Sequence, residues 1–111
     1  MKKSNIFAYI ELSKLVEELS ASADPARIKQ KLKSQSAYFN ILEPRYFSDV
    51  TVEDWEDILI TIKQKGARTD EEGKVVSNAV SNTIDHLTDR ECQAIVEKIH
   101  TVYSQVRKEF Q

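Results

Sequence analysis

The chain has 111 residues, of which 41% are hydrophobic and 31% charged, a balance that excludes both a disordered chain and a membrane protein. Only two glycines and two prolines are present, which argues against a sandwich or barrel with many tight turns. The length fits one domain spanning residues 1–111. We therefore expect an all-α fold, a compact bundle of about five helices packed mostly antiparallel.

The lone cysteine, Cys92, cannot form an intrachain disulfide, which favours a reducing compartment and a cytoplasmic location. Glu11, Lys14 and Glu17 interrupt the apolar stretch near the N-terminus, so we expect no secretory signal. No apolar run approaches the length of a membrane span, and no membrane contact is expected. The net charge is +2 over residues 1–50 and −4 over residues 51–111, so the second half should not attract phosphate backbones.

Residues 4–19 are expected to form the first helix, which carries apolar side chains on two sides. One side holds Leu12, Leu15, Val16 and Leu19. At about 100° per residue, Ile6, Phe7 and Ile10 project to the opposite side. Either these three side chains meet a second chain, as in a homodimer, or the helix is central, or bends near Ser13, and is covered on both sides.

A second helix is expected after a connector at residues 20–23, with Asp24 as its N-cap and Pro25 at its first helical position. It ends before Pro44, or earlier if Ser34 and Ser36 break it.

Residues 27–33 of this helix carry a basic run, and the pitch places two cations on each edge of an apolar stripe. A solvated rim is one interpretation and a nucleic-acid contact is the other. The basic side chains are Arg27, Lys29, Lys31 and Lys33.

Residues 44–50 are expected as a loop, and five of the nine aromatic side chains lie between residues 38 and 55. They form either a binding surface or a plug at one end of the bundle, and we favour the plug. Thr51 is expected to begin a third helix through a variant capping box with Asp54, and Gly66 to end it in a left-handed conformation.

The third helix has a buried stripe centred on Trp55 and Ile62. Its opposite face places Ile60 among the carboxylates of Glu53, Glu56 and Asp57. An apolar side chain ringed by carboxylates suits a basic protein partner, because charge steers the encounter and the apolar contact supplies affinity. The alternative is an acidic first turn that complements the helix dipole, with one exposed isoleucine.

After a polar loop at residues 67–73, a fourth helix is expected to carry Val75, Val76, Ala79, Val80, Ile84 and Leu87. Thr88 and Glu91 form a full capping box that begins the fifth helix. Its apolar stripe is Cys92, Ile95, Val96, Ile99, Val102, Tyr103, Val106 and Phe110.

Residues 87–91 also resemble the opening of the helix-turn-helix domain of LuxR-type regulators. The resemblance covers five residues, and the helix after them continues without a turn or a recognition helix, so no function is carried over.

Few residues suggest chemistry. Glu97 and His100 have the spacing of a di-iron ligand pair, but only one such motif is present and it does not face the core. Asp85 and His86 are adjacent on a helix and diverge, so they do not form a base with its orienting group. Cys92 is expected to act as a small buried hydrophobe. We expect no catalytic residues, no metal and no cofactor.

The sequence favours a small non-enzymatic module that binds a protein, acting as a regulator, an adaptor or a toxin-neutralising immunity protein. Immunity proteins enter by analogy of size and charge. The alternatives are a nucleic-acid-binding protein that uses the basic stretch at 27–33, and a small metal-binding or catalytic bundle.

Overall fold

The computed structural model describes residues 3–20 and 27–110, and these fold into a helical bundle with principal extents of 49 × 31 × 18 Å. Five helices of seven residues or more account for most of this part of the chain: α1 (Lys3–Ser20), α2 (Ile28–Ser34), α4 (Val52–Lys63), α5 (Ala79–His86) and α6 (Asp89–Lys108). The short helix α3 (Tyr38–Ile41) and the 3₁₀ helix η2 (Pro44–Tyr46) lie between α2 and α4. The expected all-α bundle is confirmed. No helix in the described residues is long and apolar enough to cross a membrane.

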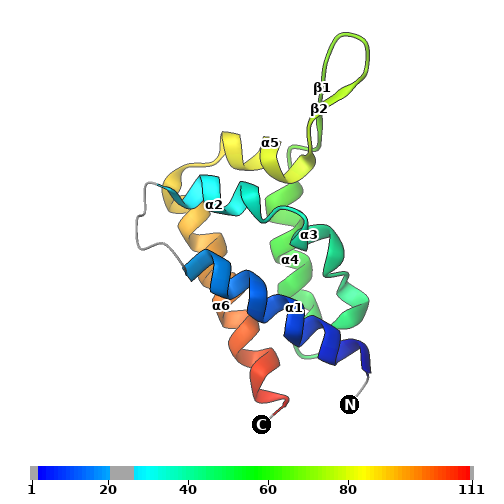
Figure 1. The fold of residues 1–111 in the computed structure, drawn as a ribbon, viewed down its shortest axis with the longest axis vertical. Coiled ribbons are helices and arrows are strands. Elements are labelled where there is room, and N and C mark those ends of the chain that lie inside the picture. The colour runs from blue at the N-terminus through cyan, green and yellow to red at the C-terminus, as the bar shows by residue number, and fades with distance from the viewer. Residues whose placement is uncertain (1–2, 21–26, 111) are drawn as a thin grey trace.

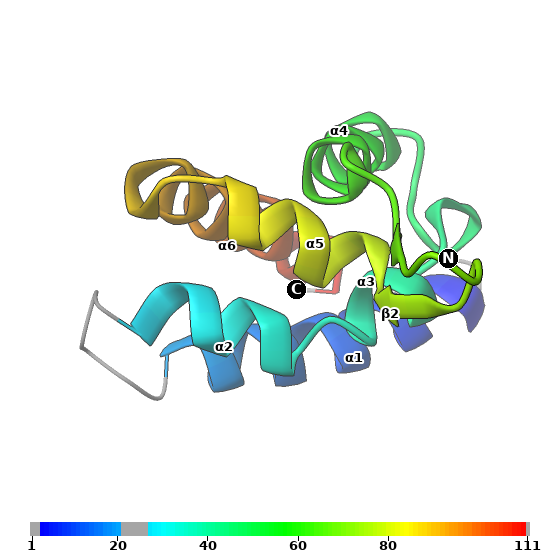
Figure 2. The same cartoon turned by 90° about the horizontal axis from the view of Figure 1, so that it is seen from above.

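The helices pack in two layers around one core. α1 and α2 lie on one side and α4 and α6 on the other, as Figure 2 shows from above. In Figure 1, α4 and α6 run in opposite directions, α2 and α5 do the same, and α1 crosses the front of the bundle. The buried side chains are mainly apolar, with polar exceptions such as Thr51 and Thr83. The fully buried apolar side chains include Leu12, Leu15, Leu32, Phe39, Leu42, Trp55, Ile58, Ile62, Ile84 and Ile99.

Three of the five aromatic side chains of residues 38–55 are buried in the bundle, as expected for a plug, while Tyr38 and Tyr46 are partly buried and pack against the core. The Trp55 ring stacks with Phe39 at 6.0 Å and with Phe47 at 5.1 Å between ring centroids. All three are buried, and the Trp55 indole Nε1–H donates to the Leu42 carbonyl at 2.6 Å. A buried indole normally needs such an acceptor, so this bond fixes α4 against the end of α3.

The helix expected between Asp24 and Pro44 is broken at residues 35–37, which leaves α2 and α3 as separate segments. The break falls where Ser34 and Ser36 allow it, because serine hydroxyls compete for backbone groups. The Ser34 hydroxyl donates to the Lys31 carbonyl at 2.8 Å. The proposed N-cap Asp24 and Pro25 lie outside the described residues.

The expected capping box at Thr51 is wrong. Thr51 has φ −108° and ψ −14°, close to helical, so its hydroxyl does not reach the free N–H groups of the first turn. The Thr51 hydroxyl lies 3.2 Å from the Ser48 hydroxyl, and the Ser48 carbonyl accepts the backbone N–H groups of Thr51 and Val52. Gly66 does adopt a left-handed conformation, with φ +67°, beyond the end of α4.

The predictions of a polar loop at residues 67–73 and of a helix that includes Val75 and Val76 are also wrong, because this segment forms a β-hairpin. Strands β1 (Arg68–Thr69) and β2 (Val75–Ser77) pair antiparallel and project from the bundle, as Figure 1 shows. The Asp70 carboxylate accepts the N–H groups of Glu72 and Lys74 across the turn, and Gly73 has φ +82°. Val75 and Val76 are therefore exposed on the hairpin, and α5 begins only after Asn78, whose side chain accepts the Ser81 N–H.

The last helix agrees with its prediction. The Thr88 hydroxyl accepts the Glu91 N–H at 3.1 Å, and the Glu91 carboxylate accepts the Thr88 N–H at 3.0 Å. The capping box therefore begins α6 as expected. Every side chain of the predicted stripe is buried in the core or packed against it.

Candidate interaction surfaces

The outer face of α4 carries the acidic cluster predicted from the sequence. Trp55, Ile58 and Ile62 turn inward, and helical pitch then directs Ile60 outward, where its side chain is 68% exposed. The carboxylates of Glu53, Glu56 and Asp57 on this side of α4 are also exposed, as is that of Asp54 at its edge. No salt bridge to any of these four carboxylates occurs within the described ranges 3–20 and 27–110.

A shallow groove runs beside this face, between α4 and α6. One hollow of about 160 Å³ is lined by Asp54, Asp57, Lys98, Thr101 and Val102. A second hollow of similar size lies further along the same two helices, and Lys98 lines both. Asp54 and Lys98 were absent from the predicted surface, because one helix's sequence does not show which of its edges packs beside another helix.

The outer face of α1 is apolar near its N-terminal end. Ile6, Phe7 and Ile10 are 45%, 38% and 47% exposed, while Leu12 and Leu15 on the other side are fully buried. Among the residues that the structure describes, the bundle covers the Leu12 side of α1 and leaves most of the Ile6 side exposed. Phe7 is the partial exception, since its ring meets Tyr46 at 5.0 Å between centroids with an interplanar angle of 67°.

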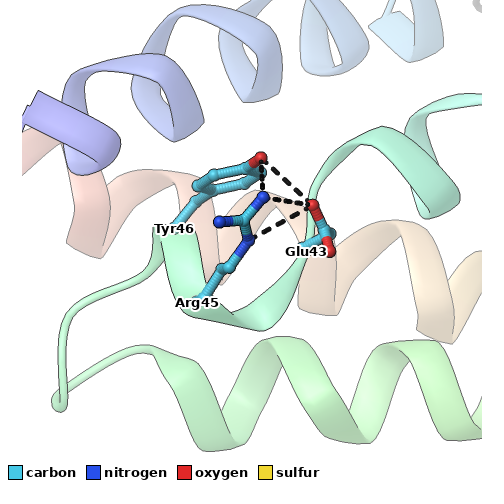
Figure 3. A network of polar contacts seen from close by, with 3 residues as sticks. All are labelled: Glu43, Arg45 and Tyr46. Atoms are coloured by element: carbon cyan, nitrogen blue, oxygen red, sulfur yellow. Dashed lines mark hydrogen bonds and ion pairs between the residues drawn. The ribbon is translucent and has the colours of Figure 1, made fainter.

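A charged network adjoins this apolar face and was not anticipated (Figure 3). The Glu43 carboxylate accepts hydrogen bonds from Arg45 Nη2 at 3.0 Å and from the Tyr46 hydroxyl at 3.1 Å. The Arg45 guanidinium lies 4.7 Å from the Tyr46 ring centroid. The bond from Arg45, then that from Tyr46, lowers the pKa of Glu43, and the same bond with Glu43 raises the pKa of Arg45. Both shifts favour the charged forms of Glu43 and Arg45.

The basic stretch lies at the other end of the bundle, on and just before α2. Lys33 Nζ contacts an Asp85 carboxylate oxygen on α5 at 2.8 Å, which lowers the pKa of Asp85. A hollow of about 210 Å³ is lined by Arg27, Gln30, Lys31 and Ser34. At least one cation of the run is thus engaged within the chain.

The residues considered for chemistry do not converge. Glu97 and His100 are exposed on α6, and His86 Nδ1 lies 2.8 Å from the Asn82 carbonyl oxygen. Cys92 is buried, and burial raises the pKa of its thiol, which disfavours the reactive thiolate. Within the part of the chain that the structure describes, no three His, Cys, Asp or Glu side chains are grouped to hold a metal ion.

Comparison of the chain with protein-family models, with curated proteins and with solved structures gives no match in any of the three.

Proposed function

We propose that this chain is a non-enzymatic module that binds a basic protein through the outer face of α4. The observation that carries the proposal is Ile60, an exposed isoleucine beside the carboxylates of Glu56 and Asp57, with Glu53 one turn further along. Exposed carboxylates steer a cationic partner to the face, and desolvation of Ile60 supplies affinity once contact is made.

The role that fits such a surface is that of a regulator, an adaptor or a toxin-neutralising immunity protein in the cytoplasm. Some toxins are nucleases, and a nuclease needs a basic surface to bind its negatively charged nucleic acid. The acidic face of α4 would complement such a surface. A buried, lone Cys92 is compatible with a reducing compartment.

The experiment is affinity capture from the native host with three versions of the chain. The wild-type chain should retain a basic protein that the double variant Ile60→Ser, Asp57→Asn loses. The matched control is Val76→Ser with Glu72→Gln, which removes one exposed apolar side chain and one carboxylate from the hairpin instead. The control should retain the partner, and all three chains should melt at the same temperature.

Two outcomes would contradict this proposal. In the first, the double variant retains the partner as well as the control does. In the second, the protein retained by the wild-type chain is acidic, because the carboxylates of α4 would then oppose the contact.

Nucleic-acid binding through residues 27–33 is the weaker alternative. Lys33 is paired with Asp85, and the second half of the chain carries a net charge of −4. A gel shift at low salt tests it. We expect no retardation of DNA or RNA at micromolar protein, and a clear shift that disappears with added salt would revive this alternative.

We also propose that the chain self-associates through the outer face of α1. Ile6, Phe7 and Ile10 form one exposed apolar strip, and such a strip is removed from water most simply by a second copy. The two faces serve different partners, since the carboxylates of α4 would repel a second α4.

A further inference from the structure

We infer that two copies of this chain meet across a two-fold axis at the α1 face, and that Arg45 of each copy pairs with Glu43 of its partner. The inference rests on the proposed self-association. It adds that the pairing of these charges determines how the two copies are oriented. It follows from an apolar strip and a pair of opposite charges that lie side by side.

The apolar strip is continuous with the charged network. On α1, Ile10 lies four residues after Ile6 and three after Phe7, so it is a surface neighbour of both and joins them into one strip. The Phe7 ring meets Tyr46, and the Tyr46 ring lies beneath the Arg45 guanidinium. Figure 3 shows Tyr46 on the side of the network that faces α1. Tyr46 therefore connects the apolar strip to the ion pair of Arg45 and Glu43.

The charges of this surface suit a second copy of itself. In a two-fold contact the same patch is present on both sides, so a surface with one sign of charge repels its copy. The network carries one carboxylate, on Glu43, and one guanidinium, on Arg45, and therefore no net charge. Both side chains are well exposed, at 50% and 70%, which lets Arg45 exchange its own carboxylate for that of the partner copy.

The face of α4 gives the contrasting case. It bears four carboxylates between residues 53 and 57 and no basic residue in that interval. A second copy docked there would bring these carboxylates together, and like charges across a contact disfavour it. Charge thus assigns the basic partner to α4 and the second copy to α1.

The dimer should be weak. A stable interface buries on the order of 800 Å² on each partner, and three half-exposed side chains supply only part of that area. An exposed ion pair adds little affinity, so Arg45 and Glu43 mainly determine which surfaces match. We expect a reversible dimer with a Kd of tens to hundreds of micromolar.

Sedimentation velocity of the full chain across this concentration range tests the contact itself. The wild-type chain should pass from monomer to dimer, and the double variant Ile6→Ser, Ile10→Ser should stay monomeric. Val75→Ser with Val76→Ser is the matched control, because it removes two exposed apolar side chains from the hairpin. The control should dimerise like the wild type, and circular dichroism should show that all three are folded.

A charge exchange tests the pairing across the axis. Glu43→Arg leaves two cations on the network and Arg45→Glu leaves two carboxylates, so each variant alone should dimerise several-fold more weakly than the wild type. An equimolar mixture should form a heterodimer with affinity close to that of the wild type, because every cation then faces a carboxylate.

The outcomes separate the two levels of the proposal. A wild-type chain that stays monomeric at millimolar concentration overturns both the self-association and the pairing, and leaves the α4 proposal as it stands. A dimer that the α1 variant abolishes, but whose charge variants show neither weakening nor rescue on mixing, overturns the pairing alone.

Discussion

Trp55 is the single residue on which several parts of the core converge. It is fully buried, stacks with Phe39 and Phe47, and donates its indole N–H to the Leu42 carbonyl. Trp55→Phe keeps an aromatic ring but leaves a cavity and a buried carbonyl without its donor. We expect the free energy of unfolding to fall by about 2–4 kcal/mol, measured by urea denaturation.

Val50→Ala is the control for this residue-scale prediction. Val50 is 71% exposed, so its truncation should change the free energy of unfolding by less than about 0.5 kcal/mol. If Trp55→Phe were as mild as the control, the hydrogen bond to Leu42 and the stacked rings would not be important for stability.

Among the secondary-structure elements, α6 is stabilised at its start by the capping box of Thr88 and Glu91. We expect this contribution to the free energy of unfolding to depend on pH. The Thr88 backbone N–H, and then the Thr88 hydroxyl, lower the pKa of Glu91 below its ordinary value of 4.5. A pKa lowered by folding means that this stabilisation is present above the unfolded-state pKa and is lost as the pH falls through the folded-state pKa.

The variant Glu91→Gln tests this prediction because it removes the ionisable group and keeps the shape. The wild-type chain should be more stable than the variant at about pH 6, and the difference should shrink toward about pH 2, as the wild-type carboxyl takes up its proton. Urea denaturation at the two pH values measures it, with Ser104→Ala on the same helix as a non-ionisable control. A difference that is the same at both pH values would contradict the role of the charged carboxylate.

We expect the hairpin to contribute little to the stability of the bundle. Both Val75 and Val76 are exposed, whereas the root of the hairpin is tied to α5 by the Thr83 hydroxyl, which accepts the Lys65 N–H at 3.1 Å. Replacing residues 69–76 by Asn-Gly, which suits a two-residue turn between paired strands, should change the free energy of unfolding by less than about 1 kcal/mol.

Thr83→Val provides the contrast at the root. It keeps the volume of a fully buried side chain but leaves the Lys65 N–H without its acceptor, and should cost about 1–3 kcal/mol. Equal losses in the two variants would mean that the hairpin itself stabilises the bundle. Thermal unfolding followed by circular dichroism compares them.

The same elements show how far the sequence leads. Helical pitch alone predicts that Ile60 and Ile10 point away from the core, because each lies opposite a fully apolar stripe. The hairpin escaped prediction because Val75 and Val76 continue the apolar spacing of Ala79 and are equally compatible with a strand. Which edges meet in space cannot be inferred from one helix at a time, so Lys98 beside Asp57 and Tyr46 beside Phe7 required the structure.

For the molecule as a whole, one contiguous core predicts one cooperative transition. The buried cluster contains side chains from α1, α2, α4, α5 and α6. If one of these helices detached, its apolar face and those of its neighbours would be exposed to water, so the helices should unfold together. Trp55 is the only tryptophan and reports on α4, whereas far-ultraviolet circular dichroism reports on every helix. Urea curves from the two signals should superimpose.

Leu32→Ala sharpens this last prediction, because Leu32 lies on α2, in the layer opposite α4. Its loss should cost about 2–5 kcal/mol, and in a single cooperative unit it should shift both curves by the same amount. If the variant shifted the dichroism curve and left Trp55 fluorescence unchanged, α2 would unfold separately. The two layers would then be independent units, and the faces of α1 and α4 would belong to parts of the chain that can separate.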